Sequence, residues 1–452
     1  MNSSRRRFLR LALAATVLPR FSLAAALGGP RKKVLILGAG MAGISAARLL
    51  RGKADVLVLE ARDRIGGRIH TQRRSDGTVI EHGANWLHSG KSNPLVPLCR
   101  DLKIPTIASD NWSSVLRATK QGPVSPEVQK KLDREFDAQV KRLLRATPSG
   151  KPSLGQVVEK VILPGLNETE KKNFLHALRT NIEDDYGDDI DKIDFAYWQA
   201  DPTEEGFDRL IPGGYDTLVN RLAEGTTILT GKKVDTVQVG HRGVTLHAGE
   251  EKWNANYVII TAPVGLLKAG VIRFDPVLPS WKTETIERIG FGTFEKAFMT
   301  VREVTWGHDI SWFDYFDDDP MRLASLFNLA KYESDSRAVI GLDAGDSARR
   351  WAGESDKVIL ARVSAAMQPF ARSPFEVTDF FRTHWHSDPL TRGSYSYPAA
   401  TELVGDRERL RKSVHDGHVL FAGEATELDQ VGTVHAAYDS GRAAAREILK
   451  KL

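Results

Sequence analysis

The chain has 452 residues, of which 41% are hydrophobic, enough for the cores of two or three domains or one large interleaved pair. Its net charge of +5 matches the five arginines of residues 1–30, which contain no acidic residue. Residues 31–452 therefore have a net charge of zero, and the charge gives no argument for nucleic acid as a partner. The single cysteine, Cys99, excludes an intramolecular disulfide. No CxxC or HExxH spacing is present, so we predict no metal site.

Residues 1–30 are predicted to be a targeting segment. Residues 4–10 read SRRRFLR and fit the twin-arginine signal pattern. The apolar run that follows, residues 11–18, is too short to span a bilayer, and residues 24–26 are small, as a signal peptidase requires. We therefore expect the twin-arginine export machinery to carry the folded protein to the periplasm, without a stable membrane anchor. The alternative is a basic N-terminus without a targeting role.

A strand–turn–helix unit opens the remaining chain. Residues 34–37 are an aliphatic run typical of a buried parallel strand, and residues 44–50 are typical of a helix. The turn between them has the pattern GxGxxG. In this pattern Gly38 makes the tight turn, Gly40 lets a pyrophosphate approach the backbone, and Gly43 lets helix and strand pack closely. The free N–H groups of the helix N-terminus favour phosphate.

A second fingerprint follows this unit. Another apolar strand, residues 55–59, ends in Glu60, whose carboxylate is placed to accept hydrogen bonds from a ribose. Residues 61–68 read ARDRIGGR, in which Gly67 allows close backbone approach and Arg68 offers a planar fork to an anion. The pattern E-A-R-x-R-x-G-G-R resembles the diphosphate-binding segment of flavin-containing amine oxidases. The resemblance implies FAD as the cofactor, since nicotinamide enzymes do not normally carry this segment.

The segment IEHGANWLHSG, residues 80–90, narrows the resemblance. Its G-A-x-W-x-H pattern, with Gly90 two residues later and N-P shortly after, is similar to the polyamine and spermine oxidase branch. His88 falls where some members carry an active-site His and others an acid, which implies that it hydrogen-bonds or orients a substrate nitrogen. The alternative for His88 is a structural role. The resemblance assigns these FAD contacts in the first region: Gly38, Gly40, Met41, Ala42, Gly43, Glu60, Ala61, Arg62, Gly67, Arg68, Gly83, Ala84, Asn85 and Trp86.

From about residue 111 to 200 the pattern becomes helical and polar. Apolar residues recur at helical spacing over residues 125–144, 154–163 and 171–179. No cofactor signature is present there, so we expect part of a substrate-binding domain. Residues 183–191 form a dense acidic run, which we expect to be a solvated loop. The alternative is a negative rim that draws cationic amines toward the entrance.

The cofactor-binding part is expected to resume near residue 207. The segment IPGGYDTL, residues 211–218, matches the family's Gly-rich turn into a helix. Val234 falls where the family's backbone meets the adenine end of FAD. Strand-like runs occur at residues 227–229, 234–239, 244–246 and 257–263.

Two further motifs concern the reacting end of the site. The segment FGTFEK, residues 291–296, resembles the family's F-G-x-x-x-K, in which Lys296 would lie near flavin N5 and hold a water. The alternative is a surface lysine ending a strand. The segment WHSDPLTRGSYSY, residues 385–397, is similar to that of polyamine oxidases and flavin-type histone lysine demethylases. The resemblance implies that Trp385 and Tyr395 flank the flavin and the substrate, because aromatic faces attract an amine cation.

The last segment resembles the family's closing cofactor motif, with VLFAGEAT at residues 419–426 and GTVHAAYDSGR at residues 432–442. The helix that begins here would stabilise negative charge at flavin N1 and O2. Monoamine oxidases tether FAD through a cysteine in this segment, and none is present, so we expect non-covalent FAD. Many oxidases place Tyr where Thr433 stands, so the resemblance does not extend to a two-aromatic cage. The resemblance assigns contacts here to Gly423, Glu424, Thr433, Val434 and Ala437.

The predicted fold class is α/β, with a Rossmann-like FAD-binding domain and an intercalated α+β substrate-binding domain. We expect the signal peptide at residues 1–30 to be followed by FAD-binding segments that alternate with substrate-domain segments. The expected FAD-binding segments are residues 31–110, 206–265 and 416–452, and the expected substrate-domain segments are residues 111–205 and 266–415.

The resemblance implies an FAD-dependent amine oxidase. A cationic amine, such as a polyamine or another primary or secondary amine, would bind, lose its ammonium proton and transfer hydride to flavin N5. Hydrolysis of the iminium would give an aldehyde and a shorter amine, and O2 would reoxidise the flavin to yield hydrogen peroxide. Three alternatives stay open: a dehydrogenase that passes electrons to a periplasmic carrier, a flavin desaturase acting on C–C bonds, and a non-catalytic binding protein stabilised by FAD. Lys296 and the Trp385–Tyr395 motif disfavour the desaturase.

Overall fold

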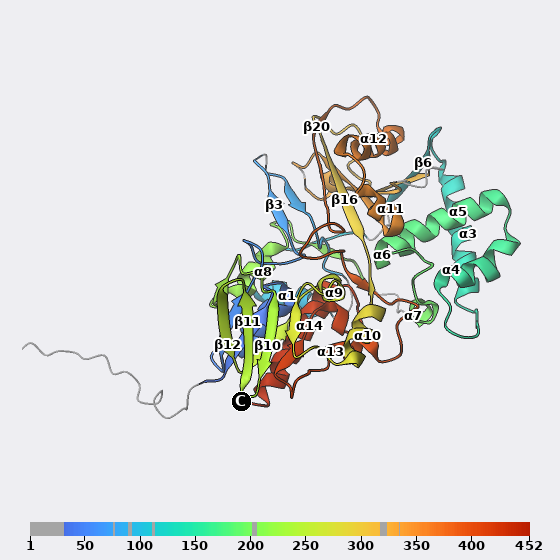
Figure 1. Ribbon diagram of the computed structural model, residues 1–452. Helices are drawn as coiled ribbons and strands as arrows, with labels where there is room; N and C mark the ends of the chain where they lie inside the picture. Colours follow the sequence, from blue (N-terminus) through green and yellow to red (C-terminus); the bar gives the residue numbers. More distant parts are fainter. Residues whose placement is uncertain are drawn as a thin grey trace, which may run out of the picture.

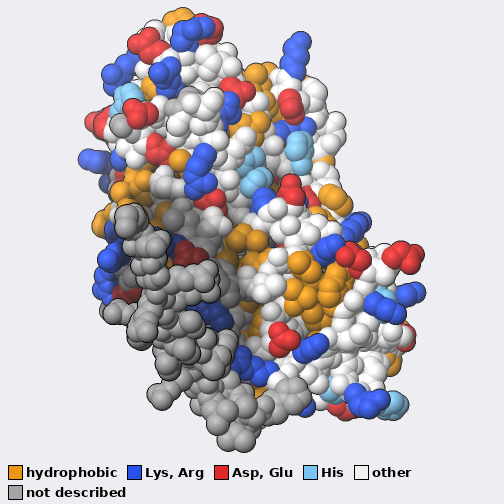
Figure 2. Space-filling view, turned by 90° about the vertical axis from the view of Figure 1, so that its left-hand side faces the viewer, with side chains coloured by type: hydrophobic (Ala, Val, Ile, Leu, Met, Phe, Trp, Pro, Cys, Tyr) orange, Lys and Arg blue, Asp and Glu red, His pale blue; other side chains and the backbone are white. Residues whose placement is uncertain are grey.

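The computed structural model describes residues 31–452 apart from 76, 89–92, 111–113, 201–205, 317–322 and 334. The predicted targeting segment, residues 1–30, lies outside the described residues. Within the described part, no helix combines the length and the apolar character needed to cross a bilayer. Lys and Arg side chains are interspersed with Asp and Glu over the face shown in Figure 2, as the balanced charge of this part of the chain predicts.

A five-stranded parallel sheet gathers strands from distant parts of the chain. Its central strand, β1, pairs with β13 on one side and with β2 on the other. β1 is an aliphatic run whose middle residues are buried, as expected for a strand covered on both faces. The strands in sheet order are β22 (Val419–Phe421), β13 (Tyr257–Ile260), β1 (Lys33–Leu37), β2 (Asp55–Leu59) and β9 (Ile228–Leu229).

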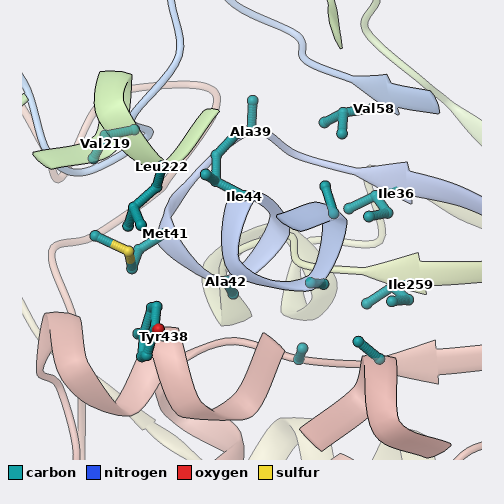
Figure 3. Packing of buried hydrophobic residues seen from close by; sticks show 14 of the residues in the cluster. Ile36, Ala39, Met41, Ala42, Ile44, Val58, Val219, Leu222, Ile259 and Tyr438 are labelled. Carbon is teal, nitrogen blue, oxygen red and sulfur yellow. The ribbon is translucent and has the colours of Figure 1, made fainter. Parts of the chain in front are cut away.

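Three helices cover one face of this sheet: α1 (Met41–Leu50), α8 (Asp216–Ala223) and α14 (Val434–Leu449). Their apolar side chains meet those of β1 in one buried cluster, which includes Ile44 of α1 and Tyr438 of α14 (Figure 3). Each helix has small or apolar residues at the contact, so the helices approach closely. The predicted strand–turn–helix unit is thus confirmed, and its helix begins earlier than expected, at Met41 within the GxGxxG pattern.

A four-stranded sheet covers the opposite face. It contains β10 (Thr236–Gly240), β11 (Gly243–Ala248), β12 (Glu251–Ala255) and β14 (Arg273–Asp275), and β14 pairs with β10 in parallel. β14 lies beyond residue 265, where the expected second FAD-binding segment ends, so this layer extends further along the chain than the sequence indicates. Nearby helices are α9 (Val264–Lys268), α10 (Ser280–Arg288) and α13 (Asp406–Arg411).

A seven-stranded sheet forms the second part of the molecule (Figure 1). Helices α11 (Gly345–Trp351) and α12 (Asp356–Met367) pack against it. Together with the helices described next, it makes the α+β part that the sequence predicts. The strands in sheet order are β20 (Val377–Arg382), β16 (Phe294–Val301), β19 (Ala338–Ala344), β18 (Ser325–Asn328), β17 (Trp312–Phe316), β6 (Val115–Thr119) and β7 (Gly122–Pro123).

The expectation of helical structure throughout residues 111–200 is wrong at its start, because β6 and β7 belong to the seven-stranded sheet. β6 pairs with β17, a strand almost 200 residues further along, with Val115 opposite Trp312. This partner is not visible in a local sequence pattern. The three expected helices are confirmed, and each has a side-chain N-cap, from Ser125, Ser153 and Asn167. They are α3 (Pro126–Leu143), α4 (Leu154–Val157) with a π-helical continuation (Val158–Ile162), and α5 (Glu168–Leu178).

Gly441 tests the close packing of α14 on α1. A Cβ at Gly441 would lie 2.0 Å from the Ala42 carbonyl oxygen and 2.3 Å from Ser45 Oγ. We expect Gly441→Ala to force the two helices apart and to lower the free energy of unfolding by about 1–3 kcal/mol. Gly240→Ala is the matched control, since a Cβ there meets nothing within 4 Å. Urea unfolding of both variants is the measurement, and equal stabilities would contradict the packing described.

Candidate active site

A cavity of about 650 Å³ lies where the strand ends of the five-stranded sheet face the seven-stranded sheet. Its size falls within the range of about 300–1,000 Å³ found for small-molecule and cofactor sites. Of the residues that the sequence assigns to the site, the following line the cavity: Gly38, Gly40, Met41, Ala42, Glu60, Ala61, Arg62, Gly67, Arg68, Gly83, Ala84, Asn85, Trp86, His88, Val234, Lys296, Trp385, Tyr395, Gly423, Glu424, Thr433, Val434 and Ala437.

Gly43 is the exception among the assigned cofactor contacts. It is not among the residues that line the cavity. A Cβ at Gly43 would lie 2.0 Å from the Gly38 carbonyl oxygen and 3.2 Å from Ile36 Cγ2. Gly43 therefore contributes close packing of α1 on β1, the role that the motif predicts for it, and does not form part of the wall.

Two glycine turns meet at one end of the cavity. Gly40 forms a parallel bridge with Gly66, and a Cβ at Gly67 would lie 3.4 Å from Gly40 Cα. Gly40 is also the N-cap of α1 and provides no side-chain cap. The first-turn N–H groups of α1 therefore face a region that the backbone can approach closely, which is an arrangement suited to an anion such as a diphosphate.

The Glu60 carboxylate holds both turns through hydrogen bonds to their backbone. Its two oxygens accept hydrogen bonds from the backbone N–H groups of Ala39 and Arg62, both at 2.8 Å. Glu60 is buried and lines the cavity, and each carboxylate oxygen can accept more than one hydrogen bond. Contact with a ribose hydroxyl stays a prediction.

Arg68 and Glu424 form an ion pair across the cavity wall. Arg68 Nη1 lies 2.7 Å from Glu424 Oε1 and 2.9 Å from the Ser394 carbonyl oxygen. Burial alone would raise the pKa of the Glu424 carboxyl, but the Arg68 guanidinium and the Ser396 hydroxyl hold it below its usual range. The pair joins residues 356 positions apart in the chain. The sequence assigns both residues to FAD but does not indicate that they bind each other.

Lys296 lies on β16 and is buried. Its Nζ donates to the carbonyl oxygens of Glu81 and Gly83, at 3.0 and 2.6 Å, and to Asn85 Oδ1 at 3.3 Å. The Trp86 ring centroid lies 5.8 Å from Nζ. Burial lowers the pKa of Lys296 to about 7, while the negative charge of Glu81 acts in the opposite direction. The alternative of a surface lysine is therefore wrong.

Trp385 and Tyr395 form two further walls. Trp385 Nε1 donates to the His82 carbonyl oxygen at 2.9 Å, and Tyr395 Oη donates to the Asp184 carbonyl oxygen at 2.9 Å. A Cβ at Gly83 would lie 3.3 Å from Trp385 Cζ2, so the backbone lies directly against the indole ring. These contacts hold both rings with their polar atoms satisfied, which leaves apolar surface toward the cavity.

His88 lies at a more open part of the cavity. Its Nδ1 lies 3.2 Å from Asp208 Oδ2, and both residues are lining residues. The sequence did not indicate Asp208, because it is 120 positions away and belongs to no motif. Trp312 on β17 was missed for the same reason; it lines the cavity and stacks on Trp86, with ring centroids 5.8 Å apart.

The acidic run at residues 183–191 is only in part the solvated loop that we expected, because Asp185 and Asp191 are exposed whereas Asp188 is buried. Burial raises the pKa of Glu183 to about 7 and that of Asp184 well above its usual value. Asp184 and Asp185 line the cavity, so the alternative of a negative rim stays open. Part of the run contacts the seven-stranded sheet, where Ser325 on β18 donates to the Asp184 carboxylate, and the local sequence cannot reveal this contact.

Asp188 belongs to a cluster of charges away from the cavity lining. Its carboxylate pairs with Arg349 and with Lys192, the latter at 3.0 Å. Within the described residues, the carboxylates of Asp188, Asp189 and Asp346 are close enough together to hold a metal ion. Lys192 and Arg349 between them pair with all three carboxylates, so we interpret the cluster as an ion-pair network that fixes the acidic run.

The family profile described as "Flavin containing amine oxidoreductase" matches residues 41–449. The chain belongs to this family. The assignment makes FAD the cofactor and amine oxidoreductase the class of enzyme. The donor set of the cavity fits FAD: glycine turns with an uncapped helix N-terminus at one end suit a diphosphate, and a buried lysine with aromatic walls at the other suits a flavin ring.

Relatives within this family differ in the activity their names state. The chain is 33% identical to "Lysine-specific histone demethylase 1 homolog 2" of Arabidopsis thaliana, over 93% of this chain and 59% of the relative. It is 29% identical to "Polyamine oxidase 4" of Oryza sativa subsp. japonica, over 93% of this chain and 89% of the relative. The chain thus spans little more than half the length of the demethylase homologues. Cyclohexylamine oxidase from Brevibacterium oxydans IH-35A superposes with a TM-score of 0.74 at 21% identity, covering 93% of this chain and 99% of that one, which supports the fold alone.

Glu424→Gln tests the pair with Arg68. The variant keeps the shape but removes the charge that Arg68 faces, and Arg68 remains 25% exposed. We therefore expect the free energy of unfolding at pH 7 to fall by about 2 kcal/mol, less than for a fully buried pair. Because the pKa of Glu424 is lower in the folded than in the unfolded chain, this stabilisation is present above the unfolded pKa and is lost as the pH falls through the folded pKa.

Urea unfolding at pH 7 and at successively lower pH measures this effect. The stability gap between wild type and Glu424→Gln should narrow in acid. Glu376→Gln, which breaks an exposed pair with Arg302, is the control and should leave unfolding unchanged. A gap that stays constant into the acid range would contradict the assignment of the charge pair.

Proposed function

We propose that the protein oxidises a cationic amine, a polyamine or another primary or secondary amine, by hydride transfer from the carbon next to nitrogen. The observation that carries the proposal is one cavity in which a buried lysine, Lys296, shares the walls with Trp385 and Tyr395, while the exposed Asp185 also lines it. Aromatic faces and carboxylates favour an ammonium group with methylenes attached. The names of the polyamine oxidase and demethylase relatives, which belong to those proteins, support the same class of substrate.

One set of residues would hold FAD. When bound, FAD supplies the hydride acceptor and passes the electrons to O2, giving hydrogen peroxide. The glycine turns at Gly40 and Gly67, with the α1 N-terminus, would hold its diphosphate, and the N-terminus of α14 at Thr433 would face negative charge on its ring. Cys99 is buried and not among the lining residues, so we propose non-covalent FAD.

The remaining side chains would act on the amine. Trp385 and Tyr395 would hold its methylenes and exclude water from the reacting carbon. His88, paired with Asp208, would hydrogen-bond the amine nitrogen or a second nitrogen of a longer substrate. Lys296 would hold a water beside the reacting atoms. Loss of the ammonium proton must precede hydride transfer, since only the neutral amine has the electron pair that stabilises the product iminium.

We further propose export by the twin-arginine route, because this route carries folded proteins and suits an enzyme that takes up FAD in the cytoplasm. The periplasm would then be its location. Its support is the SRRRFLR pattern at residues 4–10, the apolar run at residues 11–18 and the small residues at 24–26, all of which lie outside the described residues. A fusion of residues 1–30 to a folded reporter, with and without replacement of the arginines, is the way to examine it.

Anaerobic bleaching of the flavin by a panel of amines tests the proposed reaction. The panel contains spermine, spermidine, putrescine, aromatic monoamines and cyclic amines. At least one should bleach the flavin, and admission of O2 should restore the colour with formation of hydrogen peroxide. Bleaching without reoxidation by O2 would favour a dehydrogenase that uses a periplasmic carrier. A flavin that no amine bleaches would contradict amine oxidation and favour a non-catalytic binding protein.

Lys296→Met in the same assay tests whether Lys296 takes part in the reaction. We expect flavin reduction or reoxidation to slow by a factor on the order of a hundred, while FAD stays bound. Lys268→Met is the control, because Lys268 is partly buried on α9 but is not among the lining residues. An unchanged rate in Lys296→Met would remove this residue from the reaction.

A further inference from the structure

Arg407 is a buried residue of α13 that the sequence assigns to no motif. Its guanidinium has five N–H donors in a planar fork. Nε and Nη2 donate to the two oxygens of the Glu402 carboxylate, at 3.0 and 2.8 Å. Three further bonds go to the Ser396 hydroxyl at 3.2 Å, the Tyr397 carbonyl oxygen at 2.8 Å and the Ala425 carbonyl oxygen at 3.3 Å. The number of bonds therefore matches the number of donors.

Glu402 supplies the counter-charge for Arg407. Their side chains are 10% and 4% exposed, and they form an ion pair at 2.8 Å. Glu402 Oε1 also accepts from the backbone N–H groups of Gly290 and Ala399, both at 3.1 Å. A buried pair is tolerated when its geometry is good and further hydrogen bonds satisfy the remaining groups, as they do here. Neither side chain lines the cavity, so any effect on the cavity must pass through residues that do.

Ser396 is the residue through which Arg407 reaches the cavity. It begins β21 (Ser396–Tyr397) and lines the cavity. Its hydroxyl accepts from Arg407 Nη1 and donates to Glu424 Oε2. A hydroxyl has one proton, and a guanidinium can only donate. Because Arg407 occupies a lone pair of the hydroxyl, the proton is directed at Glu424.

The Glu424 carboxylate is therefore held by a donor at each oxygen. Arg68 Nη1 donates to Oε1 at 2.7 Å, and the Ser396 hydroxyl donates to Oε2. Burial alone would raise the pKa of Glu424, but the charges of Arg68 and Arg407 and the hydroxyl of Ser396 hold it below its usual range. Each carboxylate oxygen can accept more than one hydrogen bond, so Glu424 is an anion with acceptor capacity at the cavity wall.

We propose that Arg407 is a positioning residue for FAD: through the Ser396 hydroxyl it fixes the Glu424 carboxylate, which accepts hydrogen bonds from hydroxyl groups of the bound cofactor. FAD carries hydroxyl donors on its ribityl chain and its ribose, whereas its diphosphate is an anion that a carboxylate would repel. The inference rests on the proposed function, which places FAD in this cavity. Arg407 itself would touch neither FAD nor the amine.

Arg407→Lys tests the proposal, because lysine keeps the positive charge but has three donors and no planar fork. The protein is used as purified with FAD, and release of FAD after dilution is followed by the rise in flavin fluorescence. We expect release to be about tenfold faster, as for the loss of one hydrogen bond to a charged group. Ser396→Ala, which removes the hydroxyl, should have an effect of the same size.

The double variant Arg407→Lys/Ser396→Ala distinguishes positioning from a general effect on the fold. If Arg407 acts through the Ser396 hydroxyl, the second substitution has nothing further to remove, and release should again be about tenfold faster than in the wild type. Two independent effects would multiply to about a hundredfold. An increase of that size would therefore overturn the proposal.

Arg288→Lys is the matched control. Arg288 Nε and Nη2 donate to the two oxygens of Asp406, at 2.7 and 2.9 Å, and Asp406 precedes Arg407 on α13. Neither Arg288 nor Asp406 lines the cavity, so this variant should release FAD at the wild-type rate even if urea unfolding shows lower stability. If Arg407→Lys does not fold, Glu402→Gln decides, because loss of the counter-charge loosens Arg407 and should speed release by a smaller factor. An unchanged rate in the folded variant, or an equal increase in Arg288→Lys, would overturn the proposal.

Glu424→Gln in the same assay separates this inference from the placement of FAD. It should also speed release, since the amide accepts at only one of its two positions. If this variant releases FAD at the wild-type rate, Glu424 does not hold the cofactor, and the proposal is overturned together with that contact. Bleaching of the flavin by amines needs no particular rate of FAD release, so the proposed amine oxidation is judged apart from these results.

Discussion

A buried ammonium group needs oxygen atoms around it as hydrogen-bond acceptors. In this protein the ammonium group of Lys296 lies in one part of the molecule and its acceptors lie in the other, so these hydrogen bonds join the two parts. Lys296 belongs to the seven-stranded sheet, whereas the oxygens around its Nζ belong to residues 81–85, which follow the first strands of the chain. Arg68 makes a second such connection, because it pairs with Glu424 within the FAD-binding part and also donates to the Ser394 carbonyl oxygen, which lies in the other part. Each connection consists of hydrogen bonds to a charged group, which would be lost if the parts separated. Arg68 and Lys296 both line the cavity.

Much of this arrangement could be predicted because the motifs are local. The spacing of Gly38, Gly40 and Gly43 depends on one turn, and the close approach observed at Gly43 is the one that the pattern requires. The walls at Trp385 and Tyr395 also lie within one short motif. In such stretches the residues that make a contact are close together in the sequence. Their order alone therefore predicts the contact.

The features that could not be predicted all depend on distant partners. β6 is a strand because β17 offers it an edge, and Asp208 belongs to the site because the fold brings it to His88. The acidic run looks like a solvated loop by composition, yet Asp188 finds Arg349 and Lys192 after folding. The family assignment leaves the substrate open in the same way, since the relatives named as demethylases and as polyamine oxidases share the fold and differ in what their names state.

The central claim is that one cavity places the FAD diphosphate at the glycine turns and the flavin ring between Lys296 and Trp385. A crystal structure of the purified yellow protein tests it most directly. The account predicts electron density for the diphosphate beside Gly40 and the N-terminus of α1, with the ring within contact of both Lys296 and Trp385. Flavin density in any other cavity, or a colourless protein that does not take up added FAD, would contradict the account.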